Sequence, residues 1–203
     1  GGVYLQITRG VARRDHPFPK GSKPVLSMTV CAAKLPKATE VEKGVSVIIR
    51  PDIRWGRCDV KSIALLPNLL AKQEASSAGA REAWLHRPDG EITEGSVSNA
   101  YIVAEKEEVI THPADHRILG GVTRDVVLAL ARKDGIGVSE RPFTLAEACA
   151  AREAFITSTS ANVLPVTRID GASVGGGAPG AVTRRLLALY HAHILAQTGR
   201  RFA

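Results

Sequence analysis

The phrases RCDVKSI, at residues 57–63, and TEGSVSN, at residues 93–99, decide how this chain is interpreted. The first contains Lys61 and the second contains Glu94, 33 residues further on (94 − 61). A lysine taken alone indicates little, because most lysines are solvated surface charges. Residues 62–71, SIALLPNLLA, carry no charge, however. Because apolar surroundings disfavour the ammonium form of an amine, Lys61 is predicted to be a reactive amine near neutral pH.

Glu94 supplies an acid to go with this amine. It follows the turn signal RPDG at residues 87–90 and is expected to form a hairpin with a strand at residues 100–104. Taken alone it would be interpreted as a solvated loop carboxylate, because glutamate is seldom buried unpaired. Together with Lys61 it forms the pair that pyridoxal phosphate requires. The amine makes a Schiff base with the cofactor aldehyde, and the carboxylate keeps the pyridine nitrogen protonated.

The residues around Glu94 have two interpretations. Ser96, Ser98 and Asn99 are first of all ordinary turn and strand-entry residues. The alternative is that they donate hydrogen bonds around Glu94.

Residues 119–123, LGGVT, precede a helical pattern and are typical of a phosphate site, where backbone N–H groups converge at a helix N-terminus. Gly120 and Gly121 permit close backbone approach, and Thr123 is expected to cap the helix. The alternative is a plain glycine turn. A second hydroxyl-rich turn, TSTSAN at residues 157–162, follows an apolar strand and could simply end that strand.

Taken as whole phrases, these segments resemble the D-amino-acid and branched-chain aminotransferase family, the class IV, fold type IV pyridoxal-phosphate enzymes, and in particular its D-amino-acid branch. The resemblance runs from YLQITRG at residues 4–10 to the last helix, in family order. It implies an aminotransferase that moves an amino group between a D-amino acid and a 2-oxo acid through a Lys61 Schiff base. It also implies catalytic roles for Lys61 and Glu94, pyridoxal 5'-phosphate as cofactor, and a homodimer. The further cofactor contacts that it implies are Leu119, Val122, Thr123, Ser158 and Thr159.

The stretch RRDHPFP at residues 13–19 contains the candidate substrate-binding residues. If the prolines keep it extended, residues two apart project to the same side, so Arg14 and His16 can grip one carboxylate while Asp15 turns away. In the resemblance, Arg14 and His16 match the carboxylate trap of D-amino-acid aminotransferases. A basic surface loop is the alternative interpretation.

The expected fold class is mixed α/β (α+β): a large pseudo-barrel domain at residues 45–203, a linker at residues 37–44, and the remnant of a small α/β domain at residues 1–36. The linker assignment is based on the polar, Pro- and Gly-punctuated composition of that stretch. The family begins with several dozen residues before the phrase matching residues 4–10, including an arginine for the cofactor phosphate. Since these have no counterpart here, we expect the chain to be a fragment.

Alternating apolar patterns and helix signals predict the individual elements. Thr144 and Glu147 have the spacing of a capping box for one of the helices. The expected strands are residues 3–7, 25–30, 45–49, 82–86, 100–104 and 153–157, and the expected helices are residues 67–78, 123–133, 144–150 and 181–197. The glycine-rich stretch at residues 175–180 has neither a Walker ending nor dinucleotide-loop spacing.

Composition limits the remaining possibilities. The 203 residues, 44% of them hydrophobic, can bury a sizeable core. Three cysteines far apart argue against a disulfide framework and a Cys-based metal site, so no metal is expected and a cytoplasmic location is the simplest. No apolar run is long enough to cross a bilayer.

Other functions stay open. A branched-chain or (R)-amine aminotransferase would use the same Lys61 and Glu94, and aminodeoxychorismate lyase shares the same fold. Outside this chemistry, the net charge of +7 raises a non-catalytic anion- or nucleic-acid-binding domain. Nucleic acid is disfavoured as a partner because basic residues are spread along the chain and only 4% of residues are aromatic.

Overall fold

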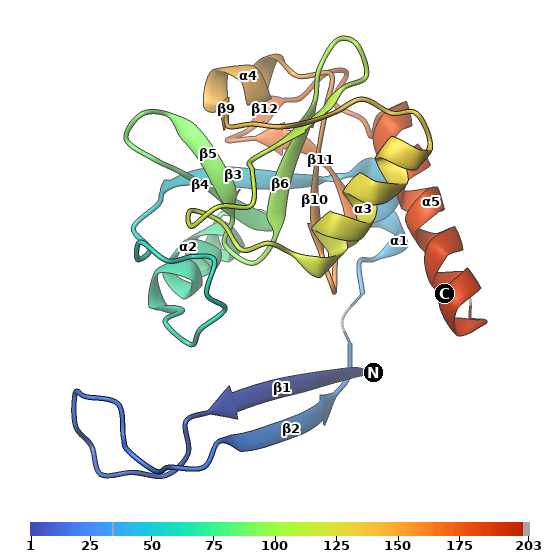
Figure 1. Ribbon diagram of the computed structural model, residues 1–203. Coiled ribbons are helices and arrows are strands. Elements are labelled where there is room, and N and C mark those ends of the chain that lie inside the picture. The colour runs from blue at the N-terminus through green and yellow to red at the C-terminus, as the bar shows by residue number, and fades with distance from the viewer. Residues whose placement is uncertain (34, 201–203) are drawn as a thin grey trace. The chain divides into compact units, whose positions relative to one another are not determined.

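The computed structural model describes residues 1–33 and 35–200, and the chain divides into two compact units, Gly1–Leu35 and Pro36–Ala203. The first unit is an antiparallel hairpin of β1 (Gly2–Thr8) and β2 (Val25–Cys31), with Gly2 opposite Cys31 at one end and Thr8 opposite Val25 at the other (Figure 1). Both strands coincide with the predicted ones to within one residue at each end.

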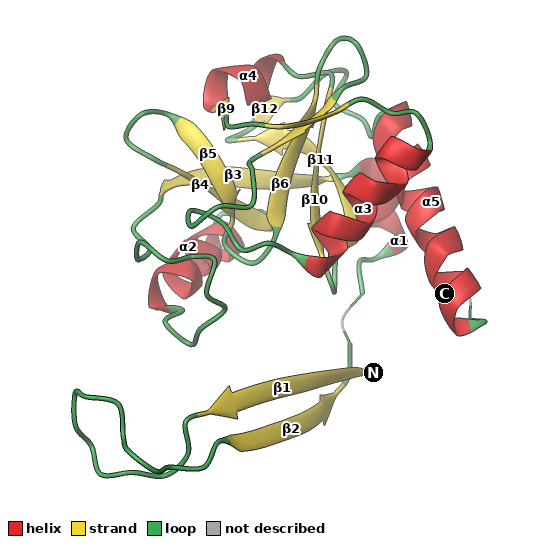
Figure 2. Ribbon diagram, viewed as in Figure 1, coloured by secondary structure: helices red, strands yellow, loops and turns green. Residues whose placement is uncertain are grey.

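The second unit contains the remaining elements, drawn by type in Figure 2. Its strands are β3 (Val45–Pro51), β4 (Glu82–His86), β5 (Glu91–Gly95), β6 (Asn99–Val103), β7 (Val109–Thr111), β8 (Val138–Glu140), β9 (Phe143–Thr144), β10 (Glu153–Ser158), β11 (Asn162–Ile169) and β12 (Ala172–Ser173). Its helices are α1 (Ala38–Lys43), α2 (Leu66–Ser77), α3 (Val122–Lys133), α4 (Leu145–Ala150) and α5 (Ala181–Thr198). All four predicted helices and all four predicted strands of this unit are present.

The strands form one mixed sheet in the order β8-β7-β6-β10-β11-β3-β4-β5-β9, with β12 on β11. The pairs β7–β8, β11–β3 and β3–β4 are parallel, and the others are antiparallel. The predicted mixed α/β class is confirmed. One detail is wrong: Glu94 belongs to a hairpin of β5 with β4, because the RPDG turn joins those two strands, and β5 is not paired with β6.

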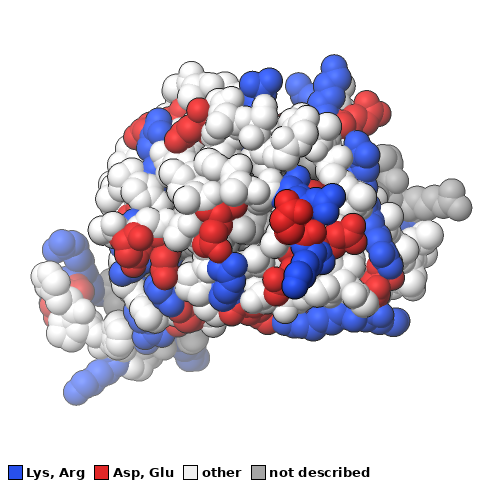
Figure 3. Space-filling model, turned by 90° about the horizontal axis from the view of Figure 1, so that it is seen from above, with Lys and Arg blue, Asp and Glu red and all other residues white. Residues whose placement is uncertain are grey.

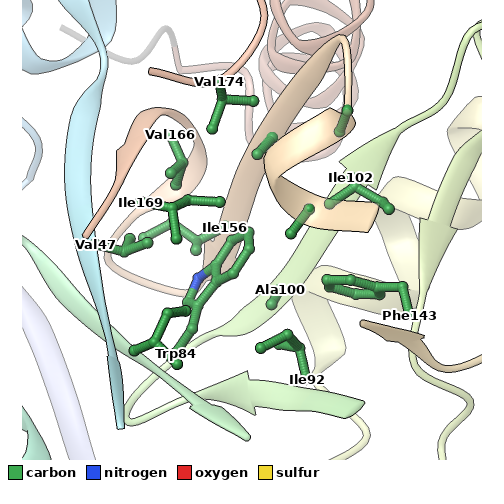
Figure 4. Packing of buried hydrophobic residues seen from close by; sticks show 14 of the residues in the cluster. Val47, Trp84, Ile92, Ala100, Ile102, Phe143, Ile156, Val166, Ile169 and Val174 are labelled. Atoms are coloured by element: carbon green, nitrogen blue, oxygen red, sulfur yellow. The ribbon is translucent and has the colours of Figure 1, made fainter. Parts of the chain in front are cut away.

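Side chains alternate between two apolar cores, as the two-residue repeat of a strand requires. Ala100 and Ile102 of β6 point into a core enclosed by the curled sheet, where they meet Trp84 and Ile92 (Figure 4). Tyr101, between Ala100 and Ile102 on β6, points the other way. The enclosed core is therefore filled with side chains and is not a channel.

Helices cover the outer faces of the sheet. The helices α3 and α5 lie on one face of the sheet (Figure 1). That face carries Tyr101 and Phe155, whose rings stack with centroids 4.4 Å apart. Over another part of the outer face, α2 packs its small residues Ala71 and Ala75 against Ile48 of β3 and the neighbouring strand β4. The helices therefore close two separate apolar layers over one sheet.

The stretch at residues 37–44, expected as a linker, carries the helix α1 within the second unit. The Lys37 N–H donates to the Glu40 carboxylate at 2.8 Å, and Glu40 pairs with Arg81. A local cap and one ion pair thus order a polar stretch that composition alone marks as irregular.

The glycine-rich stretch at residues 175–180 leads into α5. A Cβ on Gly180 would overlap Cδ of Glu153, whose carboxylate accepts the N–H groups of Val182 and Thr183 at 3.0 and 2.8 Å. The N-terminus of α5 is thus already matched by an acidic side chain. The predicted capping box of α4 is present, with Glu147 N–H donating to the Thr144 hydroxyl at 3.2 Å.

The surface carries charges of both signs. On the face of the second unit seen in Figure 3, Lys and Arg alternate with Asp and Glu and form no continuous basic stripe. Within residues 1–33 and 35–200, no helix has the length and hydropathy needed to cross a membrane, and no cluster of three or more His, Cys, Asp or Glu could hold a metal ion.

Candidate active site

Glu94 is a buried carboxyl group at the centre of a polar cluster. It is 5% exposed on β5. Its Oε1 accepts the Leu119 N–H at 3.0 Å and also contacts Nη1 of Arg54, and its Oε2 accepts Nδ2 of Asn99 at 3.0 Å. Burial raises the pKa of Glu94 to about 7, although the Arg54 guanidinium opposes this shift. Glu94 can therefore change its protonation state near neutral pH, as functional carboxyl groups often do.

Arg54 connects Glu94 to a second acid. Its Nε and Nη2 donate to the two oxygens of Asp52 at 2.9 and 2.8 Å, and Nη2 also lies 3.1 Å from the Arg117 carbonyl. Burial would lower the pKa of Arg54, but the bonds to Asp52 and the contact with Glu94 raise it. Burial also works against the Asp52 carboxylate, yet its bonds with Arg54 keep its pKa below the ordinary value.

Asn99 joins Glu94 to the N-terminus of α3. Its Nδ2 donates to Glu94 and, at 2.9 Å, to the Leu119 carbonyl. A Cβ on Gly121 would overlap Oδ1 of Asn99, so a larger residue at position 121 would force Asn99 or the start of α3 to move. Of the two interpretations of Asn99, hydrogen bonding to Glu94 is the one observed.

Ser96 and Ser98 donate hydrogen bonds to Glu82 and not to Glu94. Ser98 Oγ donates to Oε2 of Glu82 at 3.0 Å, and Ser96 Oγ donates to Oε1 of the same carboxylate. Glu82 is 1% exposed and also accepts the Ala83 N–H at 3.0 Å. Glu82 thus holds the turn between Glu94 and Asn99.

The N-terminus of α3 differs from the prediction in one respect. The N-cap residue is Gly121, in extended conformation, and Thr123 is the second residue of the helix and does not cap it. Thr123 is buried, whereas Val122 is 79% exposed. The first-turn N–H groups of such a helix have no intrahelical acceptor, so they remain available to an anion.

Lys61 lies in the loop between β3 and α2 and is exposed. The expected apolar wall is absent from the described part of the chain, because Ile63 and Leu66 of the uncharged stretch after Lys61 are themselves 73% and 66% exposed. The loop is nevertheless tied to the Glu94 cluster. Arg54 contacts Glu94, and Cys58 N–H donates to the His116 carbonyl at 2.8 Å.

Ser158 and Thr159 lie at the turn between β10 and β11. Ser158 Oγ accepts the Ala161 N–H at 3.0 Å, as in an ordinary strand-ending turn, and Thr159 is exposed.

Arg14 and His16 lie in the connection between β1 and β2 of the first unit, and both are exposed. The connection is irregular, with bends at both residues, and the His16 N–H donates to the Asp15 carboxylate at 2.8 Å.

Three members of the Glu94 cluster are not evident from the sequence: Asp52, Arg54 and Asn99, the last considered only as an alternative. The only signal for the first two is that charged residues follow directly on the apolar strand β3. Such residues often lie where the ends of neighbouring strands meet.

Known proteins are similar in sequence over almost the whole chain. The family model of amino-transferase class IV matches residues 1–169. A D-alanine aminotransferase of Bacillus licheniformis is 44% identical over 200 residues, which are 98% of this chain and 70% of that protein. A second D-alanine aminotransferase, of Listeria monocytogenes serotype 4b (strain F2365), is 44% identical over 189 residues, 92% of this chain and 64% of that protein.

Among solved structures, the branched-chain amino acid aminotransferase from Thermobaculum terrenum in its PLP-form is similar, with a TM-score of 0.78 and 26% identity, covering 98% of this chain and 66% of that one. The chain spans about two thirds of the length of the curated relatives that it matches.

Proposed function

Because the chain belongs to the amino-transferase class IV family, we propose that it is part of a pyridoxal-phosphate-dependent aminotransferase that moves an amino group between a D-amino acid and a 2-oxo acid. The observation that carries the proposal is the buried Glu94 cluster next to the loop of Lys61 and the N-terminus of α3. Two relatives named D-alanine aminotransferase support the choice of substrate class.

The residues present fit the family's cofactor. Glu94 is a buried acid with a pKa near neutrality, which suits a partner that carries its own proton, such as a pyridine nitrogen. The first turn of α3 offers backbone N–H groups at Val122 and Thr123 to a phosphate. When bound, pyridoxal phosphate supplies an aldehyde for attachment and an electron-withdrawing ring.

The chain's own residues then have separate tasks. The Lys61 amine would hold the cofactor through its aldehyde and, as a free amine, would move the proton at the substrate α-carbon. Glu94 keeps the proton on the ring nitrogen. Leu119 and Asn99 fix the Glu94 carboxylate through the bonds described above.

Four further residues belong to this proposal. Ser158 and Thr159 are assigned to the cofactor, on the resemblance of their turn to the family's. Arg14 and His16 are assigned to the substrate carboxylate, since a guanidinium and an imidazolium can both donate to it. The exposure of Arg14 and His16 leaves them accessible to a ligand.

A branched-chain aminotransferase is the second candidate, because solved structures of that name share the fold, with TM-scores such as 0.78. Assays with D-alanine, L-leucine and an (R)-amine separate these activities. Turnover of L-leucine in the absence of any D-alanine activity would replace the first proposal by the second.

We also propose a homodimer in a reducing, cytoplasmic setting. Exposed leucines on α2, including Leu66, Leu69 and Leu70, form an apolar surface of the kind that association covers. The three cysteines are free in the structure. Sedimentation at several protein concentrations tests the dimer.

Borohydride reduction tests attachment directly. The purified chain is mixed with pyridoxal phosphate, reduced, digested and mapped by mass, and the label is expected on the peptide that contains Lys61. Lys61→Ala should lose the visible cofactor band, while Lys106→Ala, an exposed lysine between β6 and β7, should keep it. A label on another lysine, with Lys61 unmodified, contradicts the proposal.

A further inference from the structure

The cluster around Glu94 contains two acids and one base. Asp52, Arg54 and Glu94 have side chains 8%, 6% and 6% exposed, so water screens their charges little. Arg54 makes a bidentate contact with Asp52 and a single contact with Glu94. With both acids ionised the group carries one uncompensated negative charge, which is costly to bury.

Neighbouring groups do not supply the missing charge. The Thr93 hydroxyl donates to Oδ2 of Asp52 at 2.8 Å, and Asn99 and Leu119 donate to Glu94. All three donors are neutral. The Cys58 thiol adds no charge either, because burial raises its pKa.

We propose that Asp52 and Arg54 are positioning residues for Glu94: Asp52 engages most of the Arg54 guanidinium, so that the buried cluster keeps one negative charge that a protonated pyridine nitrogen completes. This inference rests on the proposed function and adds the reason why the site selects a cationic ring. In the absence of Asp52, Arg54 alone would neutralise Glu94 and the cluster would have no charge left to offer.

The first test reads the proton on Glu94 without any cofactor. Carboxyl carbons are labelled with carbon-13, Glu94 is assigned by Glu94→Gln, and its chemical shift is followed against pH by NMR. Glu94 should titrate near pH 7, in line with its raised pKa of about 7. Asp52→Asn should lower that pKa, because the acid that competes for Arg54 is gone. Arg54→Met should raise it, because the opposing cation is gone.

The opposite shifts expected for the Glu94 pKa distinguish a positioning role of Asp52 and Arg54 from a general loosening of the core around Glu94. A variant that merely opens the core to water would move the Glu94 pKa downward in both cases, by relieving its burial. Thr93→Val is the matched control, because it removes a hydrogen bond to Asp52 and keeps all three charges. The inference is overturned if Asp52→Asn and Arg54→Met shift the pKa of Glu94 in the same direction. It is also overturned if Thr93→Val shifts that pKa as much as Asp52→Asn does.

The second test measures selectivity for the ring. Binding of pyridoxal phosphate is compared with that of its 1-deaza analogue, in which a C–H replaces the ring nitrogen. Asp52→Asn should reduce the preference for pyridoxal phosphate by about tenfold, the equivalent of one pKa unit. In a Glu94→Gln background the same substitution should have no effect on the preference. An equal effect in both backgrounds overturns the inference.

The two proposals fail in distinguishable ways. If the original chain binds no pyridoxal phosphate but the Glu94 pKa moves in opposite directions in the two variants, the proposed function is lost and the charge linkage stands. If Lys61 is labelled by borohydride and the two variants move the Glu94 pKa together, the linkage is lost and the function stands.

Discussion

The Asn99 side chain donates to Glu94 Oε2 at 3.0 Å across the turn that separates β5 from β6. The same NH2 group donates to the Leu119 carbonyl at 2.9 Å. Asn99 therefore uses both of its donor hydrogens inside the cluster, and its own carbonyl oxygen faces the backbone at Gly121. One side chain thus sets the distance between the acid and the start of α3.

Asn99→Asp is expected to destabilise the protein, because a carboxylate oxygen would replace the NH2 group between two acceptors. The loss should be about 2 kcal/mol, the range of an unmade bond to a charged group. It should be smaller at pH 5, where one of the facing carboxyl groups is protonated. Urea unfolding at pH 5 and pH 8 measures both values, and equal losses at the two pH values would contradict the explanation.

Gly121→Ala should lower the free energy of unfolding by about 1–3 kcal/mol, as overpacking of a well-filled site does. The added Cβ would overlap Asn99 Oδ1, and relief would require the side chain or the start of α3 to move. Gly120→Ala is the control, because its Cβ would meet only the Ala114 Cβ at an ordinary 3.8 Å. Denaturant unfolding compares the two, and similar stability of both variants would rule out the close approach.

Glu140→Gln should uncover a buried charge. Glu140 pairs with Arg124, which is 2% exposed, at 2.7 Å and with the exposed Arg132 at 2.6 Å. Breaking a fully buried ion pair costs about 3–5 kcal/mol of folding stability. Because Glu140 is partly exposed, we expect Glu140→Gln to lower the free energy of unfolding by about 2 kcal/mol. Arg132→Met, which removes the exposed partner, should cost less than about 0.5 kcal/mol.

Glu140→Gln should also change how the stability of the protein depends on pH in the acid range. Hydrogen bonds from Arg124, and then from Arg132, lower the pKa of Glu140 from its ordinary value of 4.5. Its contribution to stability is therefore present above pH 4.5 and is lost as the pH falls through the lowered folded-state pKa. Thermal unfolding between pH 3 and pH 7 should show a shallower acid decline in Glu140→Gln than in the original protein. Parallel curves would mean that Glu140 is not a source of the decline.

Glu82→Leu should loosen the turn between Glu94 and Asn99, because two serine hydroxyls lose their acceptor. Glu82→Gln should destabilise the protein by about 1 kcal/mol less than Glu82→Leu does, because a serine hydroxyl can rotate to accept a hydrogen bond from the new amide. Hydrogen exchange at residues 95–99 should speed up in the leucine variant and change little in the glutamine variant. Unchanged hydrogen exchange in the leucine variant would show that the turn does not depend on the hydrogen bonds to Glu82.

Local patterns predicted most of the regular elements, because their causes lie within a few residues. The helix α4 begins at a Thr144 and Glu147 capping box, and β6 alternates between two cores. The strand β11 was not predicted, and it contains Pro165, a residue type that is unfavourable in the middle of a sheet. The structure accommodates it because pairing with β3 starts one residue later, where Val166 meets Val45.

The site was only partly predictable for a different reason. A motif can identify Lys61 and Glu94 as chemical types, but the contact of Arg54 with Glu94 joins residues 40 positions apart. No local pattern encodes that contact. The same applies to the surroundings of Lys61, where an uncharged sequence predicted enclosure and the loop is exposed.

The central position of β3 has a consequence for biosynthesis. Its partner β11 and the bond from Ile49 N–H to Asp170 Oδ1 involve residues 121 positions further along the chain. During synthesis on the ribosome, one edge of β3 therefore stays unpaired until β11 has been translated. An unpaired apolar edge is a template for intermolecular pairing. Expression at slow translation rates is thus the condition under which chaperone demand should be greatest.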